Sequence, residues 1–316
     1  MSSPRLVFMG TPEIAAQVLQ RLVAAFPDDW VGVLSQPDRP KGRDLQLQPT
    51  PVKQAAQALG IPVWQPEKAR SPESLTLLRE LAPDAIVVVA YGQLLPPALL
   101  EIPRLGCLNL HTSLLPRWRG AAPIQWAIAS GDRITGATVM RMDAGLDTGP
   151  MLAERTTEIS DTDTGATLQD RLGQLGAELL VQILPEYLQG KRAAVPQPTE
   201  GVTYARKITK DDGRVDWSLS ATILAQRLRA FTPWPGAFTM LPTPTKPKLL
   251  KLHAAVPVDR SGPPGQVLTA DSTGIVVGCG TGALRITELQ AEGGRRLTAA
   301  QFLAGHSGLP GMTLGA

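Results

Sequence analysis

Apolar residues follow two different spacings along the first 190 residues of the chain. Short continuous apolar runs predict strands, and longer segments with apolar residues every three or four positions predict helices. The run IVVVA within Asp84–Ala90 is apolar on both faces, as expected of a central parallel strand. The predicted strands are Arg5–Gly10, Trp30–Gln36, Val63–Gln65, Asp84–Ala90 and Cys107–His111, and the predicted helices are Pro12–Phe26, Val52–Leu59, Pro72–Leu81 and Thr167–Leu188. This alternation predicts a doubly wound parallel sheet.

Local signals add detail to this pattern. Thr11 is a candidate N-cap for the first helix, with Pro12 in its first turn. Residues 37–51 are rich in Pro, Arg, Lys and Gln, which predicts a loop. Ala137–Met142 and Met151–Ile159 are further strand candidates and could form a hairpin added to the sheet.

The pattern changes after residue 189. Both periodicities are lost around Gly190–Tyr204, which indicates an interdomain linker. A helix is predicted at Ala221–Ala230, and Gly278–Gly282 reads as a hairpin turn. Short strand candidates separated by Gly and Pro follow, at Leu249–Val258, Gly265–Thr269, Gly274–Val277 and Ala283–Leu289, which is typical of a small β-barrel. We therefore predict a first domain at 1–189, a linker at 190–205 and a second domain at 206–316.

The charge is distributed unevenly between these parts. Residues 1–205 carry 18 Lys and Arg against 21 Asp and Glu, whereas residues 206–316 carry 13 against 7. A basic second domain could hold a phosphate backbone, or its charge could serve solubility alone.

Composition excludes several classes of protein. Hydrophobic residues make up 43% of the chain and charged residues 19%, which is ordinary for a globular protein. The two cysteines, Cys107 and Cys279, form no CxxC motif, so a disulfide framework or a metal site is not expected. No signal peptide and no membrane-spanning run is recognised, so a cytoplasmic location is expected.

Polar residues gather where the strand Cys107–His111 is predicted to end. Ligands of open parallel sheets bind outside the carboxyl ends of the strands. Asn109 and His111 lie two positions apart in an extended segment, so their side chains share one face and could reach the same substrate oxygen. The turn Gly10–Glu13 is not GxGxxG, so a dinucleotide site is unsupported.

The segment Asp143–Gly149 could supply a third group. A carboxylate at Asp147 would orient a charged imidazole, and the glycines would allow close approach to a ligand. An amide and an imidazolium could then stabilise a developing oxyanion. Ser113 has no obvious paired base and is not expected to be a nucleophile. A purely structural role for Asn109 and His111 remains the alternative.

Several motifs together resemble the methionyl-tRNA formyltransferases. The resemblance extends from about Arg5 to about Ala300 and keeps both parts in order. The motifs are Asn109–Pro116 (NLHTSLLP) with Arg117–Gln125, Gln36–Arg43, Val88–Gly92, Met142–Gly149, Val215–Ser218 and Arg229–Pro235.

The resemblance implies a fold, a reaction and its participants. The fold would be a Rossmann-like domain followed by an OB-like β-barrel. The reaction would transfer the formyl group of 10-formyltetrahydrofolate to the amine of initiator methionyl-tRNA, with no metal, in a monomer. The family's catalytic Asn, His and Asp fall on Asn109, His111 and Asp147, its folate contacts on Ser113, Leu114, Leu115 and Pro116, and its tRNA-contacting loop on residues 37–51 with Arg39, Lys41 and Arg43.

Two positions depart from the family pattern: Thr112 follows the histidine where Gly or Ala is usual, and Asp44–Gln48 replaces part of the loop's lysine charge. Trp118 is interpreted as a core anchor, with stacking near the tRNA end as the alternative, and Trp217 and Trp234 as packing residues at the domain junction. Rival functions are formyl transfer to a small amine such as an amino sugar, a folate-dependent dehydrogenase or hydrolase, and an RNA-binding module with a relict site.

Overall fold

The computed structural model describes residues 3–41 and 46–315. The chain divides into two compact units. The first comprises residues 1–123, 134–158 and 169–205, and the second comprises 124–133, 159–168 and 206–316. Each unit has its own hydrophobic core, so the side chains of the two units pack around separate cores.

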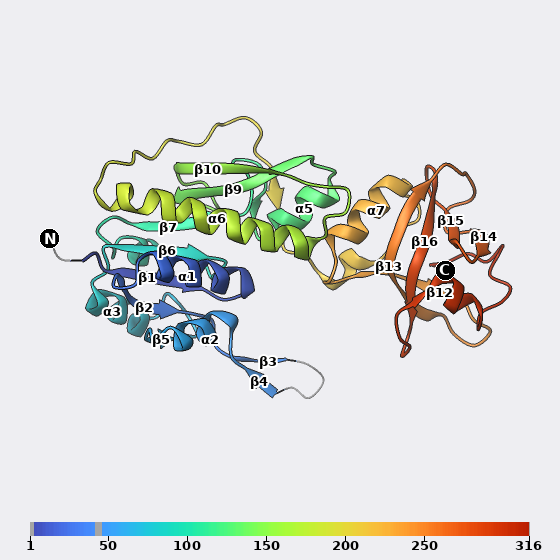
Figure 1. The fold of residues 1–316 in the computed structure, drawn as a ribbon, viewed down its shortest axis with the longest axis horizontal. Coiled ribbons are helices and arrows are strands. Elements are labelled where there is room, and N and C mark those ends of the chain that lie inside the picture. Colours follow the sequence, from blue (N-terminus) through green and yellow to red (C-terminus); the bar gives the residue numbers. More distant parts are fainter. Residues whose placement is uncertain (1–2, 42–45, 316) are drawn as a thin grey trace. The chain divides into compact units, whose positions relative to one another are not determined.

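The first unit is built on a seven-stranded sheet within the described residues, with strand order β10-β9-β7-β6-β1-β2-β5 (Figure 1). Strands β1, β2, β5, β6 and β7 are parallel to one another, whereas β9 runs antiparallel to β7 and β10 antiparallel to β9. The predicted parallel sheet with an added hairpin is confirmed. The bounds are β1 Leu6–Gly10, β2 Trp30–Leu34, β5 Val63–Trp64, β6 Ala85–Val89, β7 Cys107–His111, β9 Ile134–Arg141 and β10 Met151–Glu158.

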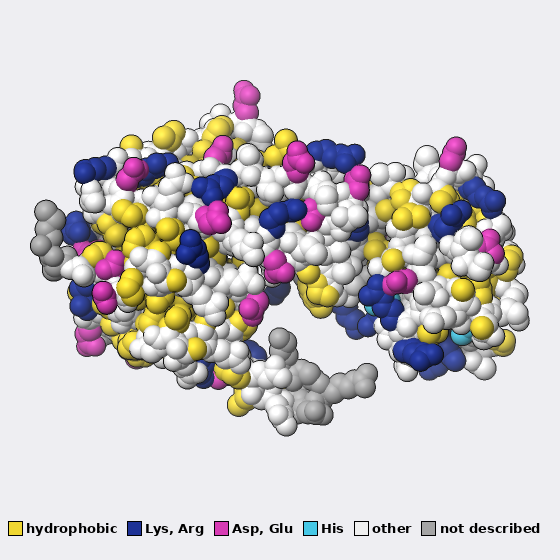
Figure 2. Space-filling view, in the orientation of Figure 1, with side chains coloured by type: hydrophobic (Ala, Val, Ile, Leu, Met, Phe, Trp, Pro, Cys, Tyr) yellow, Lys and Arg dark blue, Asp and Glu magenta, His cyan; other side chains and the backbone are white. Residues whose placement is uncertain are grey.

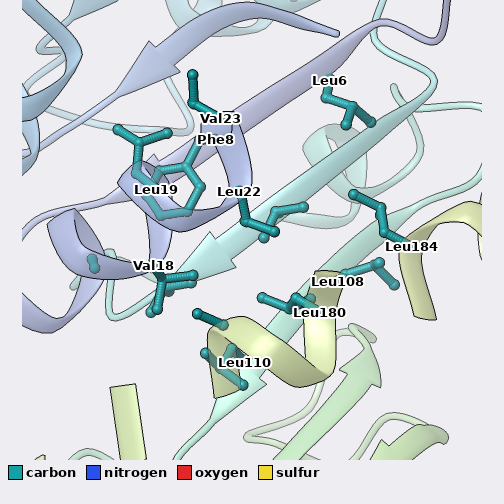
Figure 3. Packing of buried hydrophobic residues seen from close by; sticks show 14 of the residues in the cluster. Leu6, Phe8, Val18, Leu19, Leu22, Val23, Leu108, Leu110, Leu180 and Leu184 are labelled. Carbon is teal, nitrogen blue, oxygen red and sulfur yellow. The ribbon is translucent and has the colours of Figure 1, made fainter. Parts of the chain in front are cut away.

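Helices cover both faces of this sheet. Side chains of α1 (Glu13–Ala25), α2 (Pro51–Ala58) and α6 (Gly165–Leu188) pack on one face (Figure 3). Side chains of α3 (Pro72–Leu81) and α4 (Pro97–Leu100) pack on the other. Leu19, Leu108 and Leu180 are wholly buried, and burying one such side chain contributes about 1.5–3 kcal/mol. Burial on both faces explains why the strands are continuous apolar runs.

Helix starts follow the capping chemistry of the sequence, with one correction. Thr50 begins α2 and Ser71 begins α3, and each side chain accepts a backbone N–H three residues ahead. The prediction that Thr11 caps α1 is wrong: Pro12 is the N-cap, and the Thr11 hydroxyl donates to the Tyr91 carbonyl oxygen at 2.9 Å. The partner of Thr11 lies 80 residues away in the sequence, so the local sequence pattern could not predict this hydrogen bond.

Two segments predicted to lack regular structure contain short strands. The loop 37–51 holds the hairpin β3 (Arg39–Lys41) and β4 (Gln46–Gln48), so its prediction as a plain loop is wrong for those residues. The linker 190–205 ends in β11 (Tyr204–Ala205), which pairs in parallel with β8 (Arg119–Gly120). Strands of two or three residues are too short to carry a readable periodicity.

The second unit contains an antiparallel sheet in the order β12-β13-β16-β15-β14, with β17 on β16. Near the chain's end, the Gly311 N–H donates to Val267 of β14 and the Gly315 N–H donates to Met240 of β12 at 2.8 Å each. This segment therefore bonds to both end strands of the sheet, while the OB-like identity of the domain stays a prediction. The bounds are β12 Ala237–Leu241, β13 Lys248–Val258, β14 Val267–Asp271, β15 Gly274–Gly278, β16 Ala283–Ala291, β17 Leu297–Thr298, α5 Pro123–Ala129, η1 Lys210–Gly213, α7 Ala221–Ala230 and α8 Ala299–Leu303.

The tryptophans and cysteines settle several sequence interpretations. Trp217 is buried in the core of the second unit and donates from Nε1 to the Thr239 hydroxyl. Trp234 is 57% exposed, so its interpretation as a packing residue is wrong.

Cys107 and Cys279 are free and buried, as expected of small core residues. Burial raises the pKa of the Cys107 thiol to about 12 and that of Cys279 to about 11, which makes both unreactive.

A search of the described helices found none that is long and apolar enough to cross a membrane. Among the described residues, no group of three or more His, Cys, Asp or Glu side chains is arranged to hold a metal ion.

Candidate active site

The carboxyl end of β7 places two polar side chains inside an apolar sheet. Asn109 and His111 are 9% and 5% exposed, on a strand paired with β6 and β9. Their separation of two residues puts both on one face, as the sequence predicted. Buried polar groups of this kind need fixed partners, since an unpaired one costs about 1–3 kcal/mol.

Asp147 supplies partners for both residues. It lies on the loop between β9 and β10, and its Oδ1 accepts from Asn109 Nδ2 at 3.4 Å. Its Oδ2 is 3.8 Å from His111 Nδ1 and accepts the Gly120 N–H at 2.8 Å. The structure thus brings together the three residues that the sequence predicted as the catalytic set. Their catalytic roles are a separate question.

The other imidazole nitrogen fixes the orientation of the His111 ring. Nε2 is 2.8 Å from the Trp118 carbonyl oxygen, which can only accept, so Nε2 carries the proton of that hydrogen bond. Nδ1 then faces the carboxylate. In the imidazolium form both nitrogens carry an N–H. The Nε2–H would then face the Trp118 carbonyl oxygen, and the Nδ1–H would face Asp147 Oδ2.

Left-handed backbone flanks the imidazole on two sides. Asp147 has φ 52° and Trp118 has φ 62°, and neither is glycine. Such residues cost of order 1–3 kcal/mol each and persist only where surrounding contacts hold them. The sequence suggested that the glycines of this loop allow close approach to a ligand, but Gly149 has a structural reason instead. A Cβ on Gly149 would lie 1.9 Å from the Arg141 carbonyl oxygen, so β9 requires the glycine.

The predicted folate-contacting segment is braced from β9. The Thr138 hydroxyl donates to the Ser113 carbonyl oxygen at 2.7 Å and accepts the Leu115 N–H at 3.2 Å. The Ser113 hydroxyl donates to the Arg117 carbonyl oxygen at 2.6 Å, so it is occupied within its own turn. Leu115 is buried, whereas Leu114 and Pro116 are half-buried and offer apolar edges next to the end of β7.

The predicted tRNA-contacting residues lie apart from this cluster. Arg39 is exposed on β3 and pairs with Glu67 at 3.3 Å. Lys41 ends β3, and Arg43 lies outside the described residues. The base of the segment is braced: Lys53 Nζ donates to Asp38 Oδ2 at 2.6 Å, and Gln65 Nε2 donates to Asp38 Oδ1 at 2.6 Å. The hydrogen bond from Gln65, with that from Lys53, lowers the pKa of the Asp38 carboxyl.

Trp118 has an intermediate environment. Its ring is half-buried, and the Arg117 guanidinium lies 4.4 Å from the ring centroid. Trp118 is therefore less buried than a core anchor, and its ring is stacked by Arg117.

Sequence reasoning missed the part that the linker plays at this site. Thr203 accepts the Trp118 N–H on its hydroxyl at 2.9 Å, and Gln197 Nε2 donates to the Asp147 carbonyl oxygen at 2.8 Å. Loop-like composition was the only local signal in this segment, and composition does not indicate what a loop touches.

The second unit presents a basic surface. Figure 2 shows Lys and Arg side chains, dark blue, gathered along the lower edge of this unit in that view. The exposed cations include Lys210, Arg214, Lys246, Lys248, Lys251, Arg260 and Arg295. Exposed cations on one module suit a polyanionic partner.

Comparison with known proteins gives consistent results for both units. The family model described as "Formyl transferase" matches residues 4–184, and "Formyl transferase, C-terminal domain" matches residues 207–307. A methionyl-tRNA formyltransferase of Myxococcus xanthus is 52% identical over 98% of this chain and 98% of its own length.

Solved structures share the fold at low sequence identity. An N-formyltransferase from Helicobacter canadensis, in complex with folinic acid and dTDP-3-aminofucose, has a TM-score of 0.65 at 16% identity, covering 93% of this chain and all of that one. HypX from Aquifex aeolicus, in complex with tetrahydrofolic acid, has a TM-score of 0.61 at 20% identity, covering 96% of this chain and 47% of that one.

Proposed function

The chain belongs to the methionyl-tRNA formyltransferase family, and from this premise we propose how its own residues perform the transfer. The relatives are named for formyl transfer to methionyl-tRNA, and we take this as the reaction of the chain. The proposed part is the donor, 10-formyltetrahydrofolate, the acceptor, initiator methionyl-tRNA, and the residues that act on them. We also propose a cytoplasmic location, where charged tRNA is used, and, from the family resemblance, a protein that works as a monomer.

The observation that supports the chemistry is the buried cluster of Asn109, His111 and Asp147. The methionine amine attacks the formyl carbon and gives a tetrahedral intermediate with an oxyanion. The bond from that carbon to the folate N10 then breaks, N10 takes a proton, and formylmethionyl-tRNA and tetrahydrofolate leave. No covalent bond to the protein is formed.

Asn109 and His111 are assigned to the oxyanion. Asn109 has a second amide N–H beyond the one directed to Asp147 Oδ1. Each such donor typically contributes about 2.7–4 kcal/mol to transition-state stabilisation. The His111 Nε2–H donates to the Trp118 carbonyl oxygen. During the proposed reaction this N–H would leave that oxygen and donate to the oxyanion.

Asp147 is assigned to orient the imidazole and to help a water remove the proton from the attacking amine. Its Oδ2 lies 3.8 Å from His111 Nδ1 and is fixed by the Gly120 N–H. A carboxylate held by a backbone donor cannot rotate freely, which keeps it in place for both neighbours.

The two substrates are assigned to different surfaces. The half-buried Leu114 and Pro116 would contact the folate, with Ser113 and Leu115 supporting the turn. The domain at 206–316 and the segment 37–51, through Arg39, Lys41 and Arg43, would bind the tRNA. Phosphate contacts by exposed cations carry little sequence information, so they position the RNA.

A transfer assay with competing acceptors tests the proposal. Labelled formyl from 10-formyltetrahydrofolate is offered to methionine-charged initiator tRNA, methionine-charged elongator tRNA, free methionine and a dTDP-amino sugar. Formylation of the initiator tRNA alone is expected. Transfer to the amino sugar but to neither tRNA would overturn the assignment of the acceptor and favour a small amine.

A further inference from the structure

The linker between the two predicted domains runs along the candidate active site. Val195 and Met151 exchange both backbone hydrogen bonds, at 2.7 and 2.8 Å. The Arg119 N–H donates to the Thr203 carbonyl oxygen at 2.9 Å, and the Ala121 N–H donates to the Ala205 carbonyl oxygen at 2.8 Å. The linker therefore touches both loops that surround His111.

Gln197 is the linker residue that bonds to the catalytic loop itself. Its Nε2 donates to the carbonyl oxygens of Asp147 and Gly149, both at 2.8 Å. Its Oε1 accepts from Arg119 Nε at 3.1 Å and Nη2 at 2.7 Å. Because the oxygen faces the guanidinium, the amide cannot flip, and its two N–H groups must face the two carbonyl oxygens.

One of the two carbonyl oxygens belongs to Asp147 itself, and the other belongs to Gly149, two residues further along the same loop. Asp147 has φ 52°, an unfavourable value for a residue with a Cβ. Holding the peptide that follows Asp147, and the loop up to Gly149, restrains the Asp147 backbone and hence the direction of its carboxylate. A misplacement of about 1 Å at a reacting group can cost about 100-fold in rate.

We propose that Gln197, oriented by Arg119, is a positioning residue for Asp147, which makes the interdomain linker a part of the active site. The inference rests on the proposed role of Asp147 in formyl transfer. Gln197 acts through the backbone of the catalytic loop and touches neither substrate.

Two substitutions separate this role from simple packing. Gln197→Glu keeps the volume and the contact with Arg119 but removes both N–H donors, and Gln197→Ala removes the side chain. We expect both to lower kcat by about 10- to 100-fold, with KM for the folate and for the tRNA within about twofold of wild type. A packing role would instead leave Gln197→Glu close to wild type.

A matched control is available on α6. Gln182 also accepts from an arginine, Arg155 Nη2 at 2.8 Å, within the same unit. Gln182→Ala should retain wild-type kcat. Thermal unfolding of each variant shows whether a loss of rate accompanies a loss of folding.

Arg119→Met provides a second route if Gln197→Ala fails to fold. It frees the amide to rotate and should lower kcat several-fold. In a double-mutant cycle, Gln197→Glu with Arg119→Met should cost less than the sum of the two single losses, because both act on one contact.

Unchanged kcat in folded Gln197→Glu and Arg119→Met would overturn the inference. All rates are taken relative to wild type on whichever amine the wild type accepts. A wild-type protein that is inactive on tRNA would therefore count against the proposed acceptor. Variants with unchanged kcat, measured beside an active wild-type protein, would count against the role of Gln197.

Discussion

The end of β7 and the surface of the second unit hold their functional groups in opposite ways. Asn109 and His111 are almost wholly buried, and each has a fixed partner within the same unit. Lys248 and Lys251 on β13 are exposed, long and flexible. Under the proposed function, this difference implies that the chemistry depends on a few specific atoms, whereas RNA binding is shared among many similar charges. Substitutions at the end of β7 should therefore cause large losses of kcat, whereas substitutions on the second unit should cause small losses of tRNA affinity.

The largest effect is expected from removing a buried donor. Asn109→Ala and His111→Ala should each lower kcat by about 10²- to 10³-fold, because an oxyanion donor contributes about 2.7–4 kcal/mol. Steady-state kinetics with saturating folate measure the change, and tRNA binding measured separately should stay at the wild-type level. Retention of more than a tenth of wild-type kcat by folded His111→Ala would remove His111 from the mechanism.

An ion pair with a buried carboxylate inside the basic unit should matter for stability instead. Asp212 has a side chain 5% exposed, and its Oδ2 accepts from Arg206 Nη1 at 2.8 Å and from the Thr209 N–H at 2.8 Å. Asp212→Asn should lower the free energy of unfolding of the second unit by about 1–3 kcal/mol at pH 7. Chemical denaturation of the full chain measures it, with Asp211→Asn as the exposed neighbouring control.

The same pair gives a pH dependence with a defined sign. The hydrogen bond from Arg206 lowers the pKa of Asp212 below its value in an unfolded chain, about 3.9. The stabilisation is therefore present above about pH 4 and is lost as the pH falls through the lowered pKa. The stability difference between wild type and Asp212→Asn should shrink below pH 4, and a difference that is constant down to pH 2 would contradict the assignment.

Exposed lysines should have a smaller effect, confined to binding. Lys248→Ala or Lys251→Ala should weaken tRNA binding a few-fold, leave kcat unchanged and reduce the slope of log Kd against log salt by about 1. Binding titrations at several salt concentrations measure both, with Lys191→Ala on the first unit as a control. A wild-type Kd that does not vary with salt would show that this surface does not hold the RNA.

The smallest effect is expected at the root of the segment 37–51. Asp38→Asn weakens the contact with Lys53, which joins the two ends of this segment, and the contact with Gln65 after β5. KM for the tRNA should rise about two- to threefold, since a partly exposed ion pair is worth about 1 kcal/mol or less, while KM for the folate stays unchanged. Arg104→Ala, which breaks the exposed pair with Asp84, is the control. An equal rise in both KM values would point to a general loss of structure.

Sequence reasoning succeeded where one short segment carries the whole signal. The strand Cys107–His111 and the helices Pro72–Leu81 and Ala221–Ala230 have the bounds that were predicted. It failed at β12 (Ala237–Leu241), which directly follows a Pro-rich motif that reads as a loop. It also failed at Thr11 and Trp234, whose surroundings come from distant segments.

The sequence by itself determined the alternating fold of the first unit, the basic charge of the second and the shared face of Asn109 and His111. Periodicity and spacing are properties of neighbouring residues, so they can be read from one strand or helix. Only the tertiary structure decided that the left-handed residue of the catalytic loop is Asp147, and that Gln197, 50 residues further on, holds that loop. Those facts arise where separate segments meet, and a local pattern contains no record of which segments will meet.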